Sequence, residues 1–254
     1  MLTSKDNPKV RHWRRLAEDP RYRRTERRAL IEGPHLLAAA LEYGCKPLAI
    51  LVTEDGAANP EIAGLIARSR VQATELAKGV FREVVDADTP QGVAAEIAIP
   101  HSGGKGASRL VFLEGVQDPH NVGAIMRTAA AFGITKVVLD RDCADAWSPR
   151  ALRAGMGGHF ALWIEITDDL SAALNAFKGH LLCTVPQGGM PIEEADLSGA
   201  VGWLFGGEGR GLSEETLRQV PLRVTIPMAG STESLNVAAA AAICLHETFK
   251  RSAA

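Results

Sequence analysis

Cysteine is scarce in this 254-residue chain, and its spacing excludes two common uses. The four cysteines stand at positions 45, 143, 183 and 244 and form no C-x-x-C pair. Neither a disulfide framework nor a zinc site is therefore predicted. The seven histidines also lack the spacing of metal ligands, so no metal is expected. Such cysteine usage is typical of the reducing cytoplasm.

Long apolar runs are missing as well. The first ten residues, MLTSKDNPKV, contain no apolar core of a signal peptide, and no run approaches the roughly 18 residues that span a bilayer. The sequence predicts no membrane segment and a cytoplasmic location. Hydrophobic residues make up 46% of the chain and charged residues 23%, which is ordinary for a globular protein. The length suits one large or two modest domains.

The net charge of −2 is unevenly distributed. Residues 1–33 contain ten Lys/Arg and five Asp/Glu, a net charge of +5, so the remaining 18 basic and 25 acidic residues give −7. A basic arm on an acidic body indicates a polyanionic partner such as RNA. The alternative is a solvated, arginine-rich helix. Trp13 and Tyr22 lie among the arginines, where they could stack on bases.

Strand and helix patterns alternate in the first hundred residues. After the strand end ALIEG, helices are predicted at 34–43, 61–70 and 77–88, and strands at 47–55, 71–76 and 89–100. The segment HSGGKGAS then has three glycines and no periodicity, which is typical of a linker. We therefore predict a small α/β domain over 1–100, a linker over 101–108 and a second domain over 109–254.

The second domain alternates continuous apolar strands with helical patterns. The strands are RLVFLEGV, KVVLD, ALWIEI, HLLCTV, VGWLFG and LRVTIP, and the helices are NVGAIMRTAAAFG, SPRALRAG, DDLSAALNAFKG and SEETLRQV. Apolar runs of this kind are typical of strands buried on both faces. The pattern predicts an open parallel sheet with helices on both sides. Ligands of such sheets bind at the carboxyl ends of the strands.

The first of three polar strand ends is FLEGVQDPHNVGAIMRTAAAFG. Asp118 is a natural N-cap with Pro119 at the first helical position, and Gly133 ends the predicted helix. Arg127 lies off the apolar stripe of this helix, on the side of Gly123. His120 is either a catalytic base or, as is more common for a lone histidine in a turn, structural.

The second strand end, WLFGGEGRGL, is rich in glycine. The dinucleotide-binding pattern G-x-G-x-x-G does not fit, because the glycines stand at 206, 207, 209 and 211 and no acidic residue ends the following strand. The glycines indicate either close approach of the backbone to a ligand or positive φ angles in a tight turn.

The third strand end is IPMAGSTESLNVAAAAAICLHE. A strand passes through a polar turn into a helix of small residues, and Ser231, Thr232 or Ser234 is the expected N-cap. The free N–H groups of a helix start suit a polar or anionic ligand. The alternative is a buried core helix with an ordinary cap. The run Ala238–Ala242 would allow close packing against another helix or a strand.

Taken in this order, the motifs N-V-G-A-I-M-R-T, F-G-G-E-G-R-G-L and I-P-M-A-G-S-T-E-S-L-N-V resemble those of the SpoU (TrmH) family of RNA ribose 2′-O-methyltransferases. The arm and first domain, NPKVRHWRRL…ALIEGPHLLAAAL, resemble that family's ribosomal-protein-L30-like (L30e-like) substrate-binding domain. The resemblance implies an α/β catalytic domain with a deep C-terminal trefoil knot, bound S-adenosylmethionine and a homodimer.

The resemblance also assigns site residues by matching motif positions. The implied catalytic residues are Asn121, Arg127, Glu208, Ser234 and Asn236, and the implied cofactor-binding residues are Thr184, Gly206, Gly207, Ile226, Met228 and Leu235. The segment RAGMGGHF departs from the family pattern, in which a serine and small residues are frequent, at Gly155 and Met156. In the family's usual account the motif arginine, here Arg127, activates the ribose hydroxyl. A phosphate clamp that also stabilises the alkoxide is the chemically preferred alternative.

The expected substrate is structured RNA, with 23S rRNA favoured and a guanosine or another nucleotide as the target. A tRNA substrate is the first alternative. Two readings from other functional classes are a non-catalytic RNA-binding protein on the same fold and a nucleotide-dependent α/β enzyme. The complete set of motif residues argues against the former, and the missing dinucleotide pattern argues against the latter.

Overall fold

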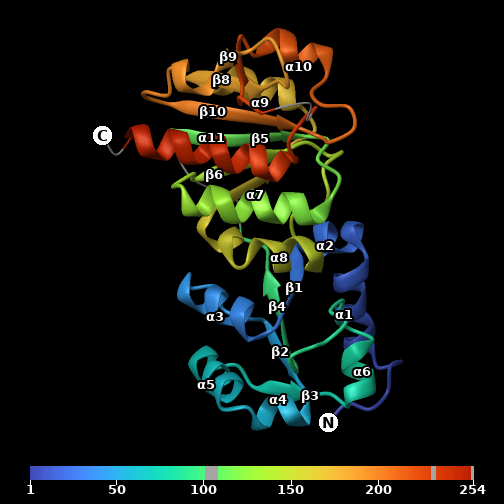
Figure 1. The fold of residues 1–254 in the computed structure, drawn as a ribbon. Coiled ribbons are helices and arrows are strands. Elements are labelled where there is room, and N and C mark those ends of the chain that lie inside the picture. Colours follow the sequence, from blue (N-terminus) through green and yellow to red (C-terminus); the bar gives the residue numbers. More distant parts are fainter. Residues whose placement is uncertain (101–107, 230–232, 253–254) are drawn as a thin grey trace. The chain divides into compact units, whose positions relative to one another are not determined.

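The computed structural model describes residues 1–100, 108–229 and 233–252 (Figure 1). By their contacts these residues form two compact units. The first contains the residues up to position 100 together with Asp145–Phe160, and the second contains residues 108–144 together with those from Ala161 onward. The sequence-based division placed all of 109–254 in one domain, and the structure differs from it at Asp145–Phe160.

This inserted segment carries helix α8 (Pro149–Gly155), which packs on strand β1 (Arg28–Glu32) of the first unit. Arg153 of α8 forms ion pairs with Glu32 at 3.3 Å and with Asp86 at 2.7 Å. These contacts join residues more than sixty positions apart, so no local pattern in the sequence reveals them.

The sheet of the first unit has the order β1-β4-β2-β3. Strand β4 (Val93–Ala98) runs antiparallel to β1 and to β2 (Ala49–Val52), and β3 (Ala73–Glu75) is parallel to β2. The accompanying helices are α3 (Pro34–Glu42), α4 (Glu54–Ala58), α5 (Pro60–Ser69) and α6 (Lys78–Arg82).

Helix α6 ends at Arg82, earlier than the predicted 77–88. The buried carboxylate of Glu32 accepts the backbone N–H groups of Asp86 and Ala87 at 2.7 and 3.1 Å. These N–H groups are therefore held by Glu32 rather than by a longer helix.

The basic arm forms helices α1 (Pro8–Glu18) and α2 (Pro20–Glu26). Trp13 is only 3% exposed, and its indole N–H donates to Glu96 at 2.9 Å. The interpretation of Trp13 as a base-stacking residue is therefore wrong, because its ring belongs to the core. Tyr22 is half-buried, and its ring is already covered by the guanidinium of Arg15 at 3.8 Å.

One cation of the arm is structural. Arg23 is 3% exposed, pairs with Asp145 at 2.7 Å, and donates to the carbonyl oxygens of Leu16 and Ala17 at 2.6 and 2.8 Å. Because this guanidinium is paired inside the unit, it is not available to a partner. The positive charge that the arm exposes is therefore smaller than the net charge of +5 counted from the sequence.

The second unit contains a seven-stranded sheet in the order β7-β6-β5-β10-β8-β11-β9, and every neighbouring pair is parallel. The strands are β5 (Arg109–Glu114), β6 (Lys136–Leu139), β7 (Trp163–Ile166), β8 (His180–Thr184), β9 (Met190–Pro191), β10 (Val201–Gly206) and β11 (Leu222–Thr225). All six predicted strands are present, and the α/β class with a parallel sheet is confirmed. Strand β9 was not predicted, because two residues carry no periodic signal.

Helices cover both faces of this sheet (Figure 1). Helices α7 (Pro119–Ala131) and α11 (Val237–Ser252) pack on each other at one face, and α9 (Leu170–Ala176) and α10 (Glu214–Gln219) lie at the other. Alternate side chains of each strand point to opposite faces, so Leu110 and Phe112 join Leu174 of α9 in one core cluster. Within the described ranges no helix is both long and apolar enough to cross a membrane.

Candidate active site

Four neighbouring strands end together at one edge of the second sheet. Strands β5, β10, β8 and β11 are adjacent and parallel, and they end at Glu114, Gly206, Thr184 and Thr225. The polar segments identified in the sequence follow β5, β10 and β11, so the sheet brings them to a common edge, where ligands of α/β sheets bind.

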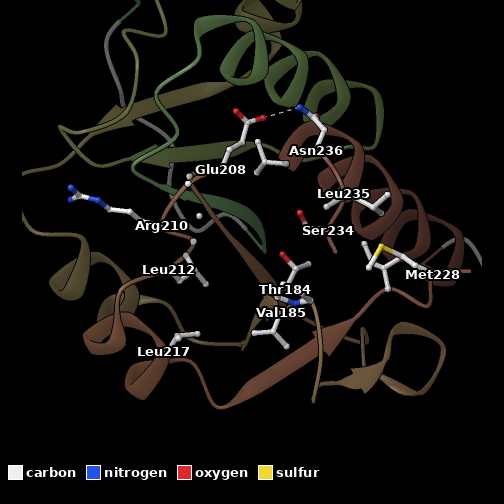
Figure 2. Close-up of a pocket in the computed structure, with 18 residues that line it drawn as sticks. Thr184, Val185, Glu208, Arg210, Leu212, Leu217, Met228, Ser234, Leu235 and Asn236 are labelled. Carbon is white, nitrogen blue, oxygen red and sulfur yellow. Dashed lines mark hydrogen bonds between the residues drawn. The ribbon is translucent and has the colours of Figure 1, made fainter. Parts of the chain in front are cut away.

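A pocket of 620 Å³ opens at this edge (Figure 2). Nine of the eleven predicted site residues line it: Thr184, Gly206, Gly207, Glu208, Ile226, Met228, Ser234, Leu235 and Asn236. Asn121 and Arg127 are not among the lining residues. The structure thus gathers residues separated by up to 52 positions, from Thr184 to Asn236, into one cavity.

The three motifs are joined by hydrogen bonds between their side chains. Asn121, buried in the first turn of α7, donates its amide N–H to Glu208 at 2.5 Å. Asn236 donates to the same carboxylate oxygen at 2.8 Å, the contact drawn in Figure 2, and to the amide oxygen of Asn121 at 3.0 Å. One residue from each motif therefore takes part in a closed triangle, in which two amide donors bind one oxygen of the Glu208 carboxylate.

Asn236 also begins helix α11. Its side-chain oxygen accepts the backbone N–H groups of Ala238 and Ala239 at 2.9 and 3.2 Å, which is the pattern of an N-cap. The sequence predicts Ser231, Thr232 or Ser234 as the N-cap. Ser234 is not the cap, because it lies two residues before Asn236. Ser231 and Thr232 lie outside the described residues.

The glycines at the end of β10 and directly after it are required by close backbone packing. A Cβ at position 207 would lie 2.1 Å from the carbonyl oxygen of Gly115, and one at position 206 would lie 2.5 Å from the carbonyl carbon of Gly211. The N–H of Gly211 donates to the carbonyl of Gly207 at 2.8 Å, and Gly211 has φ +64°. The loop that carries Glu208 is therefore fastened at both ends by the chain itself.

Arg127 lies on the exposed side of α7, away from the buried stripe that contains Val122 and Met126. It makes no hydrogen bond or ion pair with the described residues. Its placement off the stripe agrees with the sequence analysis. Gly155 and Met156, where the sequence departs from the family pattern, end α8 in the first unit and do not line this pocket.

Sequence reasoning missed half of the pocket lining. The added residues are mainly apolar or glycine: Val185, Pro186, Gly209, Gly211, Leu212, Leu217, Val237 and Ala240, together with the charged Arg210. Leu212 and Leu217 also pack against the core cluster beneath α9 and α10. Their role as pocket walls depends on the fold, although the position of Val185 and Pro186 after a parallel strand was a usable signal.

Other reactive groups near the pocket are inert. Cys183 precedes Thr184 and is fully buried, and this burial raises the pKa of its thiol to about 11. The thiol is therefore protonated and a poor nucleophile at neutral pH. The described residues contain no group of three or more His, Cys, Asp or Glu side chains placed to hold a metal ion.

Comparison with known families assigns both parts of the chain. Residues 108–246 match the SpoU rRNA methylase family, and residues 7–95 match the MRM3-like substrate-binding domain. Among curated proteins, the chain is 31% identical over 248 residues to the 23S rRNA (guanosine(2553)-2′-O)-methyltransferase RlmP of Bacillus subtilis, covering 96% of this chain and 97% of the relative. It is 28% identical over 238 residues to the 23S rRNA (guanosine-2′-O-)-methyltransferase RlmB of Pseudomonas putida, covering 87% and 96% of the two chains.

Among solved structures, the AdoMet-bound rRNA methyltransferase of Sinorhizobium meliloti superposes with a TM-score of 0.82 at 28% identity, covering 98% of this chain and 97% of that one. A crystal structure of an RNA 2′-O ribose methyltransferase superposes with a TM-score of 0.83 at 30% identity, covering 100% and 99%. The ordered motifs, the pocket they share and these similarities agree, and the chain belongs to the SpoU rRNA methylase family.

Proposed function

We propose that this protein transfers a methyl group from S-adenosylmethionine to a ribose 2′-hydroxyl of 23S rRNA. The observation that carries the proposal is the hydrogen-bonded triangle of Asn121, Glu208 and Asn236 at the mouth of the pocket. It joins all three motifs beside a cavity large enough for a nucleoside ligand. Two relatives that match most of the chain, RlmP of Bacillus subtilis and RlmB of Pseudomonas putida, are named as 23S rRNA 2′-O-methyltransferases.

The pocket fits S-adenosylmethionine better than a nucleotide. Its walls combine apolar side chains such as Leu212, Leu217 and Met228 with backbone at glycines, and its charged lining residues are Glu208 and Arg210. Such a surface suits a nucleoside with an amino-acid tail. Cation-rich phosphate cradles, which a nucleoside triphosphate requires, are not formed by these lining residues. Backbone at Gly206, Ile226 and Leu235 and the side chain of Thr184 would hold the donor.

When bound, S-adenosylmethionine supplies an electrophilic methyl group on its sulfonium sulfur. The acceptor hydroxyl becomes a good nucleophile as its proton leaves, so the protein must position it and stabilise negative charge on oxygen. Arg127 is suited to this task, because it is exposed and without a described partner, and its planar fork of donors matches a phosphate. Arginine stays protonated in proteins, so we assign Arg127 as a clamp on the target phosphate that stabilises the alkoxide.

The remaining motif residues act as positioning groups. Asn121 and Asn236 hold the Glu208 carboxylate, and Asn236 also starts helix α11. Ser234 is exposed, lines the pocket and lies two residues before Asn236, at which this helix begins. We assign it to the ribose end of the substrate. The exposed cations of the basic arm would supply phosphate contacts for the rest of the RNA.

The assembly and the chain path are part of the same proposal. Ile243 and Phe249 of helix α11 are 39% and 43% exposed, and Leu235, which precedes the helix and lines the pocket, is 36% exposed. These exposed apolar side chains favour a homodimer interface next to the pocket. The resemblance to the family favours a deep trefoil knot in the C-terminal segment of the chain. A crystal structure that traces this segment tests the knot. A cytoplasmic location, where ribosomal RNA is modified, completes the proposal, and fractionation of cells tests it.

The deciding experiment is methyl transfer followed by mapping. Protein, labelled S-adenosylmethionine and a chelator are incubated with unmodified 23S rRNA, with unmodified tRNA in a parallel reaction, and 2′-O-methyl positions are mapped. Transfer to one ribose of 23S rRNA is expected. Transfer to tRNA alone would move the substrate to the alternative class, and RNA binding without transfer would identify a non-catalytic RNA-binding protein.

A further inference from the structure

Arg210 occupies the tip of the fastened glycine loop at the pocket mouth. The loop is closed by the backbone hydrogen bond between Gly211 and Gly207 at 2.8 Å, and Gly207 lies directly against Gly115. Gly209, the neighbour of Arg210, has open space around it. The main chain of Arg210 is therefore pre-positioned, while its long side chain remains exposed.

The two charged residues of this loop differ in whether other side chains bind them. Glu208 and Arg210 are the charged residues among the described residues that line the pocket. The Glu208 carboxylate is held by the amides of Asn121 and Asn236. Arg210, by contrast, has no hydrogen bond or ion pair with any described residue, and in Figure 2 its guanidinium extends away from Thr184, Met228 and Leu235. A free planar cation therefore stands at the rim of the cavity.

The chemistry of the proposed donor indicates what this cation binds. The reacting sulfur of S-adenosylmethionine is itself positive, so a guanidinium is not placed to attract it. An arginine with all of its N–H donors available recognises oxyanions with a planar, bidentate geometry. Two oxyanions would come near the rim, namely an RNA phosphodiester from outside and the carboxylate of the donor from inside. The outward direction of Arg210 favours the phosphodiester.

We propose that Arg210 binds a backbone phosphate of the RNA substrate at the pocket mouth, as a positioning residue separate from Arg127. The inference rests on the proposed function and assigns part of its RNA-binding surface. It predicts that one loop contributes both to the donor pocket and to the surface at the pocket mouth that binds RNA. Glu208 is held within the motif triangle, and Arg210 faces the incoming RNA.

The test compares Arg210→Gln with Arg218→Gln in the full chain. Arg218 is a matched control, because it is an exposed arginine of the same unit whose i,i+4 partner Glu214 lies 3.7 Å away, and it does not line the pocket. Binding of transcribed, unmodified 23S rRNA is measured over a range of salt concentrations, and donor affinity is measured by calorimetry.

For Arg210→Gln we expect RNA affinity to fall by roughly tenfold, the effect of one charge-assisted contact. The slope of log affinity against log salt should fall in magnitude by about 1. Donor affinity should stay within about twofold of the wild type, and Arg218→Gln should change neither quantity. An unchanged salt slope in Arg210→Gln, with wild-type protein active, would overturn the inference. Weakened donor binding with unchanged RNA binding would reassign Arg210 to the donor carboxylate. Wild-type protein that transfers no methyl group to any RNA would instead overturn the proposed function.

Discussion

Asn236 performs two tasks that substitutions can separate. Its side-chain oxygen caps helix α11 through Ala238 and Ala239, and its amide N–H groups hold Glu208 and Asn121. Asn236→Ser retains a capping oxygen and loses the amide donors. Asn236→Ala loses both functions. Asn236→Asp retains the cap and places a second carboxylate against Glu208.

The expected costs follow from these contacts. Loss of a donor to a partly exposed carboxylate is worth about 1 kcal/mol of unfolding free energy, and loss of an N-cap is worth about 1 kcal/mol. Asn236→Ser should therefore be destabilised by about 1 kcal/mol and Asn236→Ala by about 2 kcal/mol. Because the triangle positions the motif residues, single-turnover methyl transfer should fall by roughly tenfold in Asn236→Ser, equivalent to about 1.4 kcal/mol of barrier.

The aspartate variant adds a pH test. Two carboxylates in contact raise the pKa of the pair, because they cannot both ionise without repulsion. When the pKa of a carboxyl is higher in the folded than in the unfolded state, the protein is more stable at low pH. That contribution to the free energy of unfolding is lost as pH rises through the folded-state pKa. Relative to Asn236→Ser, Asn236→Asp should therefore be least stable near pH 8 and should recover toward pH 4. Urea unfolding at several pH values measures this. Equal stability of the two variants at pH 8 would refute the triangle as drawn.

Four further outcomes are expected. Arg127→Lys should lower single-turnover rates by roughly 10²-fold without recovery up to pH 10, because lysine keeps the charge and loses the fork; strong alkaline recovery would indicate that Arg127 removes the proton. Burial lowers the pKa of His159 to about 4, so this group should cost about 3 kcal/mol of stability as pH falls from about 6.5 toward 4. In urea unfolding, His159→Leu should lose less stability than the wild type as pH falls. An identical loss in both proteins would show that His159 is not the group responsible. Ile243→Glu should convert the proposed dimer to a monomer in light scattering, and a wild-type monomer at micromolar concentration would rule out that interface. Gly207→Ala should be destabilised by at least 1 kcal/mol, as expected for overpacking, whereas Gly209→Ala, with open space around its Cβ, should stay within about 0.5 kcal/mol in urea unfolding.

The sheet of the second unit could be predicted because its signal is local. Strands β5 and β6, for example, contain the apolar and partly β-branched runs VFL and VVL, and Gly115 and Asp140 follow them. Asp118, Pro119 and Gly133 likewise mark the limits of α7 in the sequence itself, and the structure confirms all three. The α/β class and the meeting of the motifs at one sheet edge follow from these patterns.

The burial of Trp13 and the placement of Asp145–Phe160 depend on contacts between distant residues. Trp13 lies among arginines in the sequence, but Val10, Trp13 and Leu16 recur at helical spacing and form the buried side of α1. That periodicity was the available signal, and it outweighs the neighbouring charges. The assignment of Asp145–Phe160 to the first unit rests on ion pairs such as that of Arg23 with Asp145. No window of sequence contains both partners.

The glycine loop has a packing role that the sequence alone does not indicate. The sequence predicts that these glycines either let the backbone approach a ligand or adopt positive φ angles in a tight turn, and Gly211 has φ +64°. Gly206 and Gly207 additionally let the chain pack against the backbone of Gly211 and Gly115. This packing leaves Glu208 between two fastened points, within reach of Asn121 and Asn236. A carboxylate on a freely moving loop would lose entropy each time the site formed, whereas here the loop is restrained before any substrate arrives. The glycines therefore serve the proposed chemistry through preorganisation of the protein, and the same restraint fixes the point from which Arg210 extends toward the RNA.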